Sequence, residues 1–237
     1  MPIRRRTPSI SRAACGLIAA FAALSSATLH VHPAAADAEW VSLFDGATLD
    51  GWQANEAPES FVVEDGTIVA RGAPRSHLFY VGEGAPFRDF ELEVEVRTAP
   101  RSNSGIYFHT RYQDTGWPRE GFEVQINATH SDRSKTGSLY HVVDVRNSPV
   151  RDGEWFQYRV QVEGRRVQIQ VNDVTTVDYT EPEGKKAGQR FTHRLGEGTF
   201  ALQAHDPRSV VAFRNLRVRP ITTPPAGSAP SSRGDAP

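Results

Sequence analysis

Three short segments of the chain alternate polar with apolar side chains, and the polar types are those that bind hydroxyl groups and carry protons. With the period of two that a strand has, each segment places its polar residues on one face: Tyr107, His109 and Arg111; Glu123, Gln125 and Asn127; Gln203 and His205. Amides, carboxylates and guanidinium groups pair with hydroxyls in defined geometry, and Glu and His are common acid/base catalysts. The pattern predicts a polar sheet face that binds a sugar-like ligand.

Aromatic and loop residues would complete such a face. Trp117 or Tyr112 could act as a platform for a sugar ring, and His130 lies in a polar loop that could rim the same surface. The competing interpretation is that the polar rows are the solvent face of a half-exposed sheet. Short amides such as Gln125 and Gln203 favour a ligand site, because solvent faces prefer charged side chains like the alternating acids of segment 90–97.

Short strands must position these rows. Segment 90–97 alternates acidic and apolar residues strictly, and Glu163-Gly164 marks a hairpin between two alternating runs. Further strands are predicted at 105–111, 122–127, 138–145, 199–205 and 210–219. No window has helical periodicity and no internal repeat is found. The sequence therefore predicts an all-β domain, a two-sheet antiparallel β-sandwich.

The two ends of the chain differ in composition from the middle. Residues 1–36 combine four arginines, an apolar stretch and Ala34-Ala35-Ala36, the layout of a secretory signal peptide cleaved near Ala36; a short membrane anchor is the alternative. Residues 221–237 are rich in Pro, Ser and Gly, which predicts a disordered tail. We expect one folded domain over 37–220 in a periplasmic or secreted protein without stable membrane insertion after signal cleavage.

Charge and cysteine content exclude several classes of protein. A net charge of −1 gives no counterion-release driving force, so no nucleic-acid partner is expected. The single cysteine leaves no intrachain disulfide and no thiolate zinc site. The chain has no phosphate-binding loop, dinucleotide fingerprint, nucleophile elbow or zincin motif. A small carbohydrate is the expected partner, and the sequence indicates no particular oligomeric state.

A glycosidase that works with two carboxylates needs one on each side of the scissile bond. Laminarinase-like sandwich enzymes carry Glu-x-Asp-x-x-Glu along one strand, whereas this chain has Glu123, Gln125 and Ala128 at those positions. Only the first carboxylate is present. Hydrolysis by a carboxylate pair centred on this strand is therefore not expected.

The chain resembles a known family in a series of segments that run in order along it. The segments are 40–52, 61–66, 103–106, 123–126, 136–140, 153–155, 171–172, 202–205 and 213–216. The opening Trp-Val-Ser-Leu-Phe-Asp-Gly-Ala-Thr-Leu-Asp-Gly-Trp and the closing Phe-Arg-Asn-Leu are similar to signatures of the 3-keto-disaccharide hydrolase (DUF1080) family. That resemblance implies a concanavalin A-like jelly roll, export from the cytoplasm and action on oxidised sugars. The chain departs from the family pattern at His109, where Arg is usual, and at Asn127, where Asp is common.

The resemblance implies a hydrolase or lyase that cleaves 3-keto-glycosides. A ketone at C3 acidifies the C2 proton, so that a base can remove it, an enolate forms and the aglycone leaves from C1 before water adds. This route needs a base, a stabiliser for the enolate oxygen and a donor to the leaving group. The candidates are Glu123 or His205 as base, Arg214 or His109 as enolate stabiliser, and Tyr140 as donor.

Three alternatives stay open at the level of sequence. A divalent ion held by His205, Glu123 and a loop residue would also stabilise the enolate, although no ligand spacing requires one. Arg214 could instead be a structural fork between the sheets. The whole face could also belong to a non-catalytic, lectin-like carbohydrate-binding module, which would use the same amides and aromatic platform.

Strand alternation also predicts where the site lies. His109, Glu123, Gln125 and His205 should converge on one sheet face, with functional atoms on neighbouring strands within roughly 10 Å of one another. Arg214 should reach the same face or its rim. The apolar residues that alternate with these rows should lie between the sheets.

Overall fold

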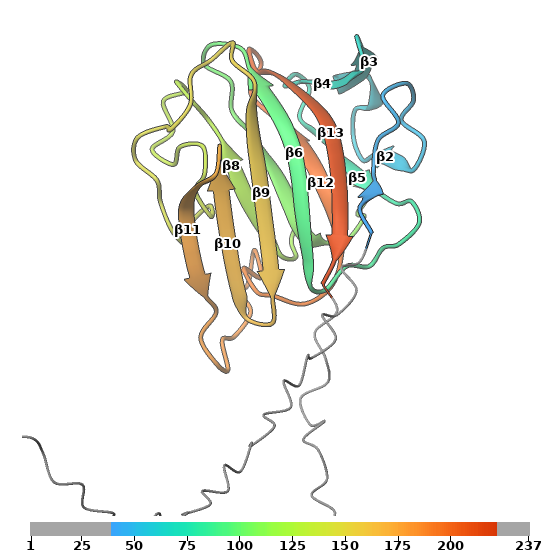
Figure 1. Ribbon diagram of the computed structural model, residues 1–237. Helices are drawn as coiled ribbons and strands as arrows, with labels where there is room; N and C mark the ends of the chain where they lie inside the picture. Colours follow the sequence, from blue (N-terminus) through green and yellow to red (C-terminus); the bar gives the residue numbers. More distant parts are fainter. Residues whose placement is uncertain (1–38, 222–237) are drawn as a thin grey trace, which may run out of the picture. The chain divides into compact units, whose positions relative to one another are not determined.

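The computed structural model describes residues 39–221, which form thirteen strands and one short 3-10 helix (Figure 1). The elements are β1 (Val41–Ser42), β2 (Trp52–Ala54), η1 (Pro58–Ser60), β3 (Phe61–Glu64), β4 (Thr67–Arg71), β5 (Ser76–Tyr80), β6 (Phe90–Thr98), β7 (Ser104–Thr110), β8 (Phe122–Ile126), β9 (Phe156–Glu163), β10 (Arg166–Val171), β11 (Val174–Thr180), β12 (Thr199–Ala204) and β13 (Val210–Pro220). The all-β prediction is confirmed.

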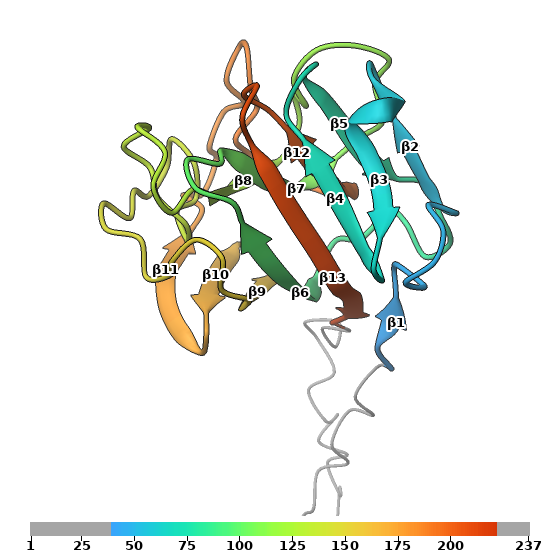
Figure 2. The same ribbon diagram turned by 90° about the horizontal axis from the view of Figure 1, so that it is seen from above.

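The strands form two antiparallel sheets that pack face to face. Sheet A has eight strands in the order β11-β10-β9-β6-β13-β4-β3, with β1 paired to β13; sheet B has five in the order β2-β5-β12-β7-β8. Figure 1 shows β9, β6 and β13 in front of β8 and β12, and Figure 2 shows the same layers from above. This is the predicted two-sheet antiparallel sandwich.

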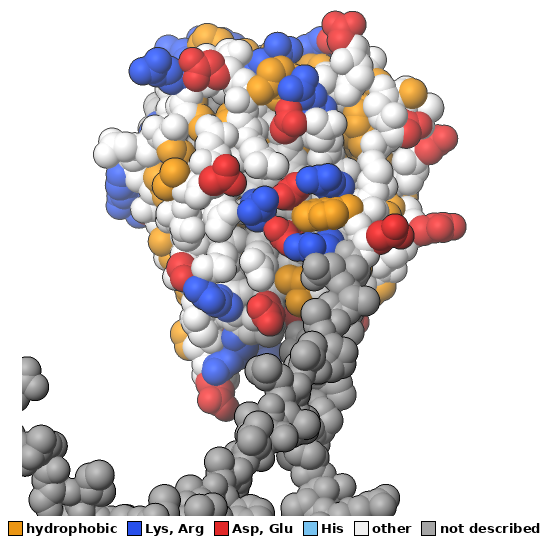
Figure 3. Space-filling model, in the orientation of Figure 1, with side chains coloured by type: hydrophobic (Ala, Val, Ile, Leu, Met, Phe, Trp, Pro, Cys, Tyr) orange, Lys and Arg blue, Asp and Glu red, His pale blue; other side chains and the backbone are white. Residues whose placement is uncertain are grey.

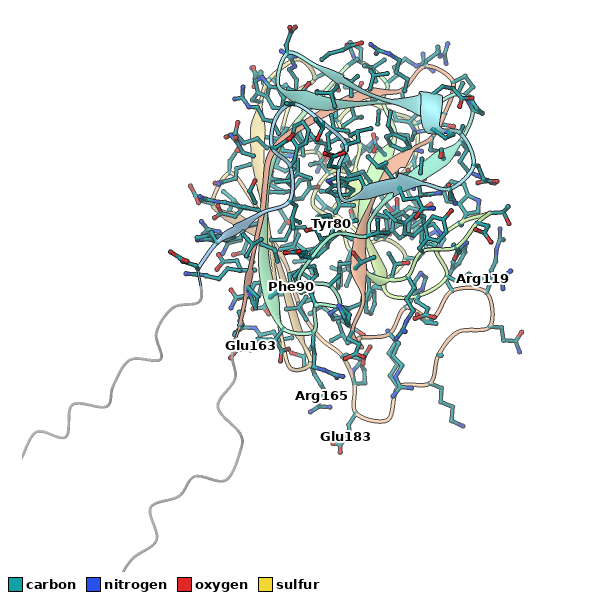
Figure 4. All side chains as sticks on the ribbon, turned by 90° about the vertical axis from the view of Figure 1, so that its right-hand side faces the viewer. Tyr80, Phe90, Arg119, Glu163, Arg165 and Glu183 are labelled. Atoms are coloured by element: carbon teal, nitrogen blue, oxygen red, sulfur yellow. The ribbon has the colours of Figure 1, made fainter. Side chains whose placement is uncertain are left out.

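The core lies between the sheets because every second residue of the strands is apolar. Along β9 the burial alternates strictly between buried and half-buried or exposed residues. Phe90 of sheet A meets Phe108 of sheet B edge to face, with ring centroids 5.9 Å apart. Figure 4 shows the layers from the side, with Phe90 and Tyr80 among the side chains that fill the space between them. The residues predicted to face inward all belong to this core: Phe108, Phe122, Val124, Ile126 and Leu202.

The predicted hairpin is the β9–β10 pair, and the other predicted strands are found with one exception. Segment 138–145 is not a strand but a series of turns, so this prediction is wrong. Ser138 Oγ accepts a hydrogen bond from the Val145 amide at 2.8 Å and donates to the Lys135 carbonyl at 2.8 Å, which satisfies polar groups within the segment. The Tyr140 amide donates to the Glu123 carbonyl at 2.9 Å, so this segment is fixed along β8.

The outer face of sheet A is a ladder of ion pairs. The acids of β6 point outward, as their alternation predicts, but Glu93 is only 3% exposed. Arg159 and Arg217 reach over its carboxylate from the strands on either side, at 2.7 and 2.9 Å. Figure 3 shows this face as alternating basic and acidic side chains. The charged side chains of this face therefore pair with one another.

The predicted signal peptide, residues 1–36, and almost all of the predicted tail, 221–237, lie outside the described residues. Within 39–221, no helix is long and apolar enough to cross a membrane.

Candidate functional site

A cavity of about 310 Å³ lies over the outer face of sheet B, on the side away from sheet A. Its floor comes from β7, β8 and β12, and its walls come from the loops that flank these strands. The lining residues are Asn103, Tyr107, Trp117, Pro118, Arg119, Glu120, Gly121, Phe122, Glu123, Gln125, Asp132, Tyr140, His141, Arg190, Phe191, His193, Gln203 and His205. The volume and the mixture of aromatic and polar groups are typical of a small-molecule site.

Glu123 lies at the centre of the floor and is held by two neighbours. Tyr107, its register partner on β7, donates from Oη to Glu123 Oε2 at 2.8 Å. Gln203 on β12 donates from Nε2 to Glu123 Oε1 at 2.9 Å, and the same Nε2 lies 3.1 Å from Tyr107 Oη. These bonds fix the carboxylate in position on three adjacent strands.

Burial makes Glu123 a weak acid. Its side chain is withdrawn from water, which raises its pKa from 4.5 to about 7, although the hydrogen bonds from Tyr107 and Gln203 act in the opposite direction. Gly105 gives the carboxylate its space: a Cβ at this position would lie 2.3 Å from Glu123 Oε1. The site thus contains a carboxyl group that can take up and release a proton near neutral pH.

A second polar row lies beside Glu123. Gln125 donates from Nε2 to Asn103 Oδ1 at 2.7 Å, and Asn103 donates from Nδ2 to Asp206 Oδ2 at 2.8 Å. His205 Nδ1 lies 3.5 Å from both Asn103 Nδ2 and Asp206 Oδ2. Burial lowers the pKa of His205, so its imidazole is neutral at pH 7. The row presents oriented amides and an imidazole to hydroxyl or carbonyl groups.

Trp117 forms an aromatic wall at this end of the cavity. Its ring contacts His205 edge to face at 4.8 Å and His77 at 5.3 Å, and the Arg75 guanidinium carbon lies 5.0 Å from its centroid. His77 is fully buried beneath it, and neither ring nitrogen has a hydrogen-bond partner in the described part of the chain. Contacts on several sides hold the indole ring in position as a platform.

The opposite wall comes from two loops. Tyr140 donates to Asp132 Oδ2 at 3.3 Å, and burial raises its pKa to about 12, so its hydroxyl stays protonated. His141 stacks on Tyr140 at 4.2 Å and faces His193 at 6.3 Å. Both histidines have a left-handed backbone, with φ of 60° and 41°.

Six of the residues predicted from the sequence line this one cavity: Trp117, Glu123, Gln125, Tyr140, Gln203 and His205. They come from β8, from β12 and its end, and from two loops. The predicted convergence of Glu123, Gln125 and His205 is therefore found, and Glu123 and His205 share one face. Their roles in a reaction stay a proposal.

His109 does not join them. The register between β7 and β12 shifts here, so two residues, Phe108 and His109, lie opposite Phe200 alone. His109 adopts a φ of 55° at this bulge, and its side chain turns into the end of the core. Its Nε2 donates to the Arg88 carbonyl at 2.8 Å and its Nδ1 accepts from the Gly196 amide at 3.2 Å. The prediction that alternation continues through His109 is wrong.

Arg214 lies on the other sheet. It belongs to β13 of sheet A, where its Nε donates to Glu95 Oε2 at 2.8 Å and its guanidinium carbon lies 4.0 Å from the Trp155 ring centroid. The prediction that it reaches the polar face or its rim is wrong. These contacts agree with a structural role on the outer face of sheet A.

Three predicted residues surround the cavity without lining it. Arg111 pairs with Glu120 at 3.0 Å on the exposed rim. Asn127 is fully buried and donates to the carbonyls of Asp132 and Ser134 at 3.1 and 2.9 Å, which closes the loop behind Tyr140. His130 Nε2 lies 3.2 Å from Asp206 Oδ2. Asn127 and His130 thus support the cavity rather than form its surface.

The sequence patterns gave no role to several residues that line the cavity. Alternation placed Tyr107 on the polar face, but its bond to Glu123 needed the strand register. The remaining ones lie on loops, where period-two reasoning has no force: Asn103, Arg119, Asp132, His141, Arg190 and His193. Only the arrangement in space brings them together.

The described residues contain no group of three or more His, Cys, Asp or Glu side chains that could hold a metal ion. Of the two protein ligands considered from sequence, Glu123 accepts one hydrogen bond at each oxygen, from Tyr107 and from Gln203. The steps proposed below use protein side chains alone.

Known proteins were compared with this chain in sequence and in fold. A protein of Bacteroides thetaiotaomicron named 3-keto-disaccharide hydrolase is 31% identical over 78 residues, 29% of this chain and 27% of that protein. The matched stretch therefore spans about a quarter of that relative's length. It connects the chain to that protein only over this stretch.

Solved structures show the same fold. A Parabacteroides distasonis protein, whose name assigns it provisionally to the glycosyl hydrolases, has a TM-score of 0.65 and 21% identity, covering 77% of this chain and 94% of that one. A Bacillus licheniformis β-glucanase has a TM-score of 0.50 and 11% identity, covering 78% and 99%. At these identities the likeness concerns architecture alone, and it confirms the jelly-roll sandwich.

The family model described as a 3-keto-alpha-glucoside-1,2-lyase-like domain matches residues 39–219, nearly all of the described chain. The match covers both sheets and every loop that lines the cavity. The resemblance found in the sequence motifs is thereby confirmed, and the chain belongs to this family.

Proposed function

We propose that the protein cleaves 3-keto-glycosides by removing the C2 proton of the oxidised sugar, with Glu123 as the base. The observation that carries the proposal is the buried carboxyl group of Glu123, fixed by Tyr107 and Gln203, with a pKa of about 7 in a cavity of oriented amides. Such a group takes up a proton in one step and returns it in another at neutral pH. Family membership and the name of the Bacteroides relative support the substrate class.

Glu123 suits the role of base better than His205. Burial lowers the pKa of His205, so the imidazole is neutral and weakly basic. A neutral imidazole that donates from one ring nitrogen can bind the C3 oxygen and stabilise the charge that develops there. Gln125 and Asn103 lie in the same row and can donate to the same oxygen or to neighbouring hydroxyls. This assignment replaces His109 and Arg214, which lie elsewhere.

The proposed sequence of steps balances without a cofactor. Glu123 takes the C2 proton, and the electron pair forms an enolate through C2, C3 and the C3 oxygen. The enolate then expels the aglycone oxygen from C1, and Tyr140, whose hydroxyl is protonated, donates a proton to it. Water adds to C1 of the resulting enone and gives its proton to the Tyr140 phenolate, and Glu123 returns the proton to C2. The products are a 3-keto sugar and the free aglycone.

The direct test compares a 3-keto-disaccharide with its unoxidised parent and follows release of the aglycone. The proposal expects turnover of the keto form alone, because only the ketone acidifies C2. Asp132 also lines the cavity, so equal turnover of the parent would indicate a paired-carboxylate hydrolysis and would contradict the proposal. The Glu123→Gln variant should lose about 10²- to 10⁴-fold in kcat, the usual contribution of a general base.

A lectin-like binding module would use the same amides and the Trp117 platform. The buried carboxyl group favours catalysis, because a sugar-binding carboxylate gains nothing from a raised pKa that removes its charge. Binding of the keto sugar without turnover would favour the module instead. Export to the periplasm or beyond, predicted from residues 1–36, is part of this proposal and is tested by fractionating cells that express the full chain.

A further inference from the structure

The cavity has two ends of different chemical character, separated along β8. Gln125 lies in the amide row with Asn103 and His205, whereas Phe122 lies three residues earlier on the same strand, about 10 Å away at 3.3 Å per residue. Glu123 lies between them, so the proposed base separates the two ends of the cavity.

The Phe122 end is built from two segments that are fastened to each other. The Thr192 amide donates to the Arg119 carbonyl at 2.8 Å, and Thr192 Oγ1 accepts from the Gly121 amide at 3.0 Å. His193 stacks over Phe122 with centroids 6.2 Å apart. The backbone of Arg119 and the segment 190–192 therefore lie side by side, and both Arg119 and Arg190 line the cavity. Figure 4 shows Arg119 outside sheet B, beside the pale-orange loop that carries residues 181–198.

Besides Glu123, two carboxylates line the cavity together with the two arginines: Glu120 and Asp132, of which Asp132 accepts a hydrogen bond from Tyr140. Glu120 is paired with Arg111 at 3.0 Å, and Asp144, on the far side of Tyr140, is paired with Arg133 at 2.7 Å. Among the residues that the structure describes, neither Arg119 nor Arg190 forms an ion pair with a carboxylate. The arginines of sheet A differ from these two, since they form ion pairs with acidic side chains of the same sheet.

His141 and His193 add ring nitrogens to the same end, with centroids 6.3 Å apart. At the amide end, by contrast, the charged groups already have partners: Asp206 is turned toward Asn103 and His130, and Arg75 is paired with Glu56. One end is thus suited to neutral hydroxyls and a carbonyl, and the other to an anion.

We infer that the aglycone of the substrate carries an oxyanion, a carboxylate or a phosphate, which Arg119 and Arg190 bind while the keto sugar occupies the amide end. This inference rests on the proposed function for the identity of the sugar at the amide end. A guanidinium group binds both oxyanions through two parallel hydrogen bonds. The substrate class is accordingly a 3-keto-glycoside of an acidic sugar or a sugar phosphate.

A binding measurement tests this inference independently of turnover. The probes are three unoxidised glucosyl disaccharides that differ only in the second ring: glucose, glucuronate and glucose 6-phosphate. Their affinity for the Glu123→Gln variant is measured by calorimetry at low ionic strength. We expect at least one acidic disaccharide to bind about tenfold more tightly than the neutral one, as one charge-assisted pair provides. Whichever acidic disaccharide binds more tightly identifies the oxyanion as a carboxylate or a phosphate.

Adding Arg119→Ala and Arg190→Ala to the Glu123→Gln variant should reduce its preference for the acidic disaccharide to less than about twofold. Added salt should weaken the same preference in the variant that keeps both arginines. Arg194→Ala, an exposed arginine of the same loop that does not line the cavity, is the matched control and should keep the preference. Equal affinity for all three disaccharides overturns the inference, as does an equal loss for neutral and acidic probes in the double variant. Absence of turnover with every keto substrate contradicts the proposed function alone.

Discussion

Tyr107 Oη donates a hydrogen bond to Glu123 Oε2 at 2.8 Å from the residue directly opposite it on the neighbouring strand. The bond favours the ionised carboxylate, while burial favours the protonated acid, and burial dominates. The acidity of Glu123 is therefore set by two opposed effects that mutation can separate.

Removing the Tyr107 hydroxyl should make Glu123 a still weaker acid. In Tyr107→Phe the pKa should rise above the present value of about 7, because one bond to the carboxylate is lost and burial is kept. The acidic limb of the profile of kcat/KM against pH should move to higher pH, so activity at pH 7 falls and partly recovers above it. Tyr112→Phe, a nearby tyrosine that does not line the cavity, should leave the limb in place. An unmoved limb in Tyr107→Phe would show that Glu123 is not the group that titrates.

The raised pKa of Glu123 also predicts how stability depends on pH. The folded protein holds this proton up to about pH 7, whereas the unfolded chain releases it near 4.5, so the contribution is fully present below 4.5 and is lost as pH rises through 7. A shift of this size corresponds to about 3 kcal/mol. Glu123→Gln should remove this loss. The free energy of unfolding of the variant, relative to that of the wild type, should therefore increase as pH rises from 4.5 to 7. Denaturant titrations at several pH values measure this difference. Parallel curves of unfolding free energy against pH for the two proteins would contradict the prediction.

Gly105 should matter for activity more than for stability. In Gly105→Ala the new Cβ would lie 2.3 Å from Glu123 Oε1 and 2.7 Å from its Cγ, so the carboxylate must move. A displacement of about 1 Å at a reacting group can cost about 100-fold in rate, whereas the fold loses at most the two hydrogen bonds that hold this side chain, about 1 kcal/mol each. Gly196→Ala, where nothing lies within 4 Å of the added Cβ, is the control. Thermal unfolding alongside kcat separates the two effects, and full activity in Gly105→Ala would refute the expectation.

His77 should make the protein sensitive to acid. Burial first, then the charges of Arg75 and His205, lower its pKa from 6.5 to about 3, so the folded state keeps it neutral while the unfolded chain protonates it. Stability due to this residue is present above pH 6.5 and is lost as pH falls toward 3. His77→Phe should lessen the loss of unfolding free energy between about pH 7 and pH 4, because no proton is taken up on unfolding at this position. An unchanged loss would mean that His77 is already protonated in the folded state.

The fold could be predicted because period-two alternation is strong in the long strands. The acid–apolar rows of β6 and the runs on either side of Glu163-Gly164 each fix one buried face, and two such faces make a sandwich. The strands β1 to β5 were not assigned, since two to five residues of mixed character carry little periodic signal, and β11 was not assigned either, since only Val177 in it is buried. Segment 138–145 misled for a related reason: its apolar residues alternate but its polar groups are satisfied within turns.

The site could be predicted only as far as alternation holds. Glu123, Gln125 and Gln203 lie in regular parts of β8 and β12, and they meet as expected. His109 fails because a bulge adds one residue and turns its side chain inward. Arg214 fails because a strand's pattern does not say which of two sheets it joins. The loop residues of the cavity carry no periodic signal at all.

The central claim is that Glu123 removes the C2 proton, and isotope transfer at C2 tests it directly. A 3-keto-disaccharide labelled with deuterium at C2 is incubated with the wild type and with Glu123→Gln, and the label is followed in the product and in recovered substrate, with enzyme-free product as the control for spontaneous exchange. We predict that wild-type turnover is slower for the labelled substrate than for the unlabelled one, because the C2 bond breaks whether or not Glu123 returns the same deuteron, and that the variant releases no label above the control. Equal rates for the labelled and unlabelled substrates, or label release that persists in Glu123→Gln, would contradict the account.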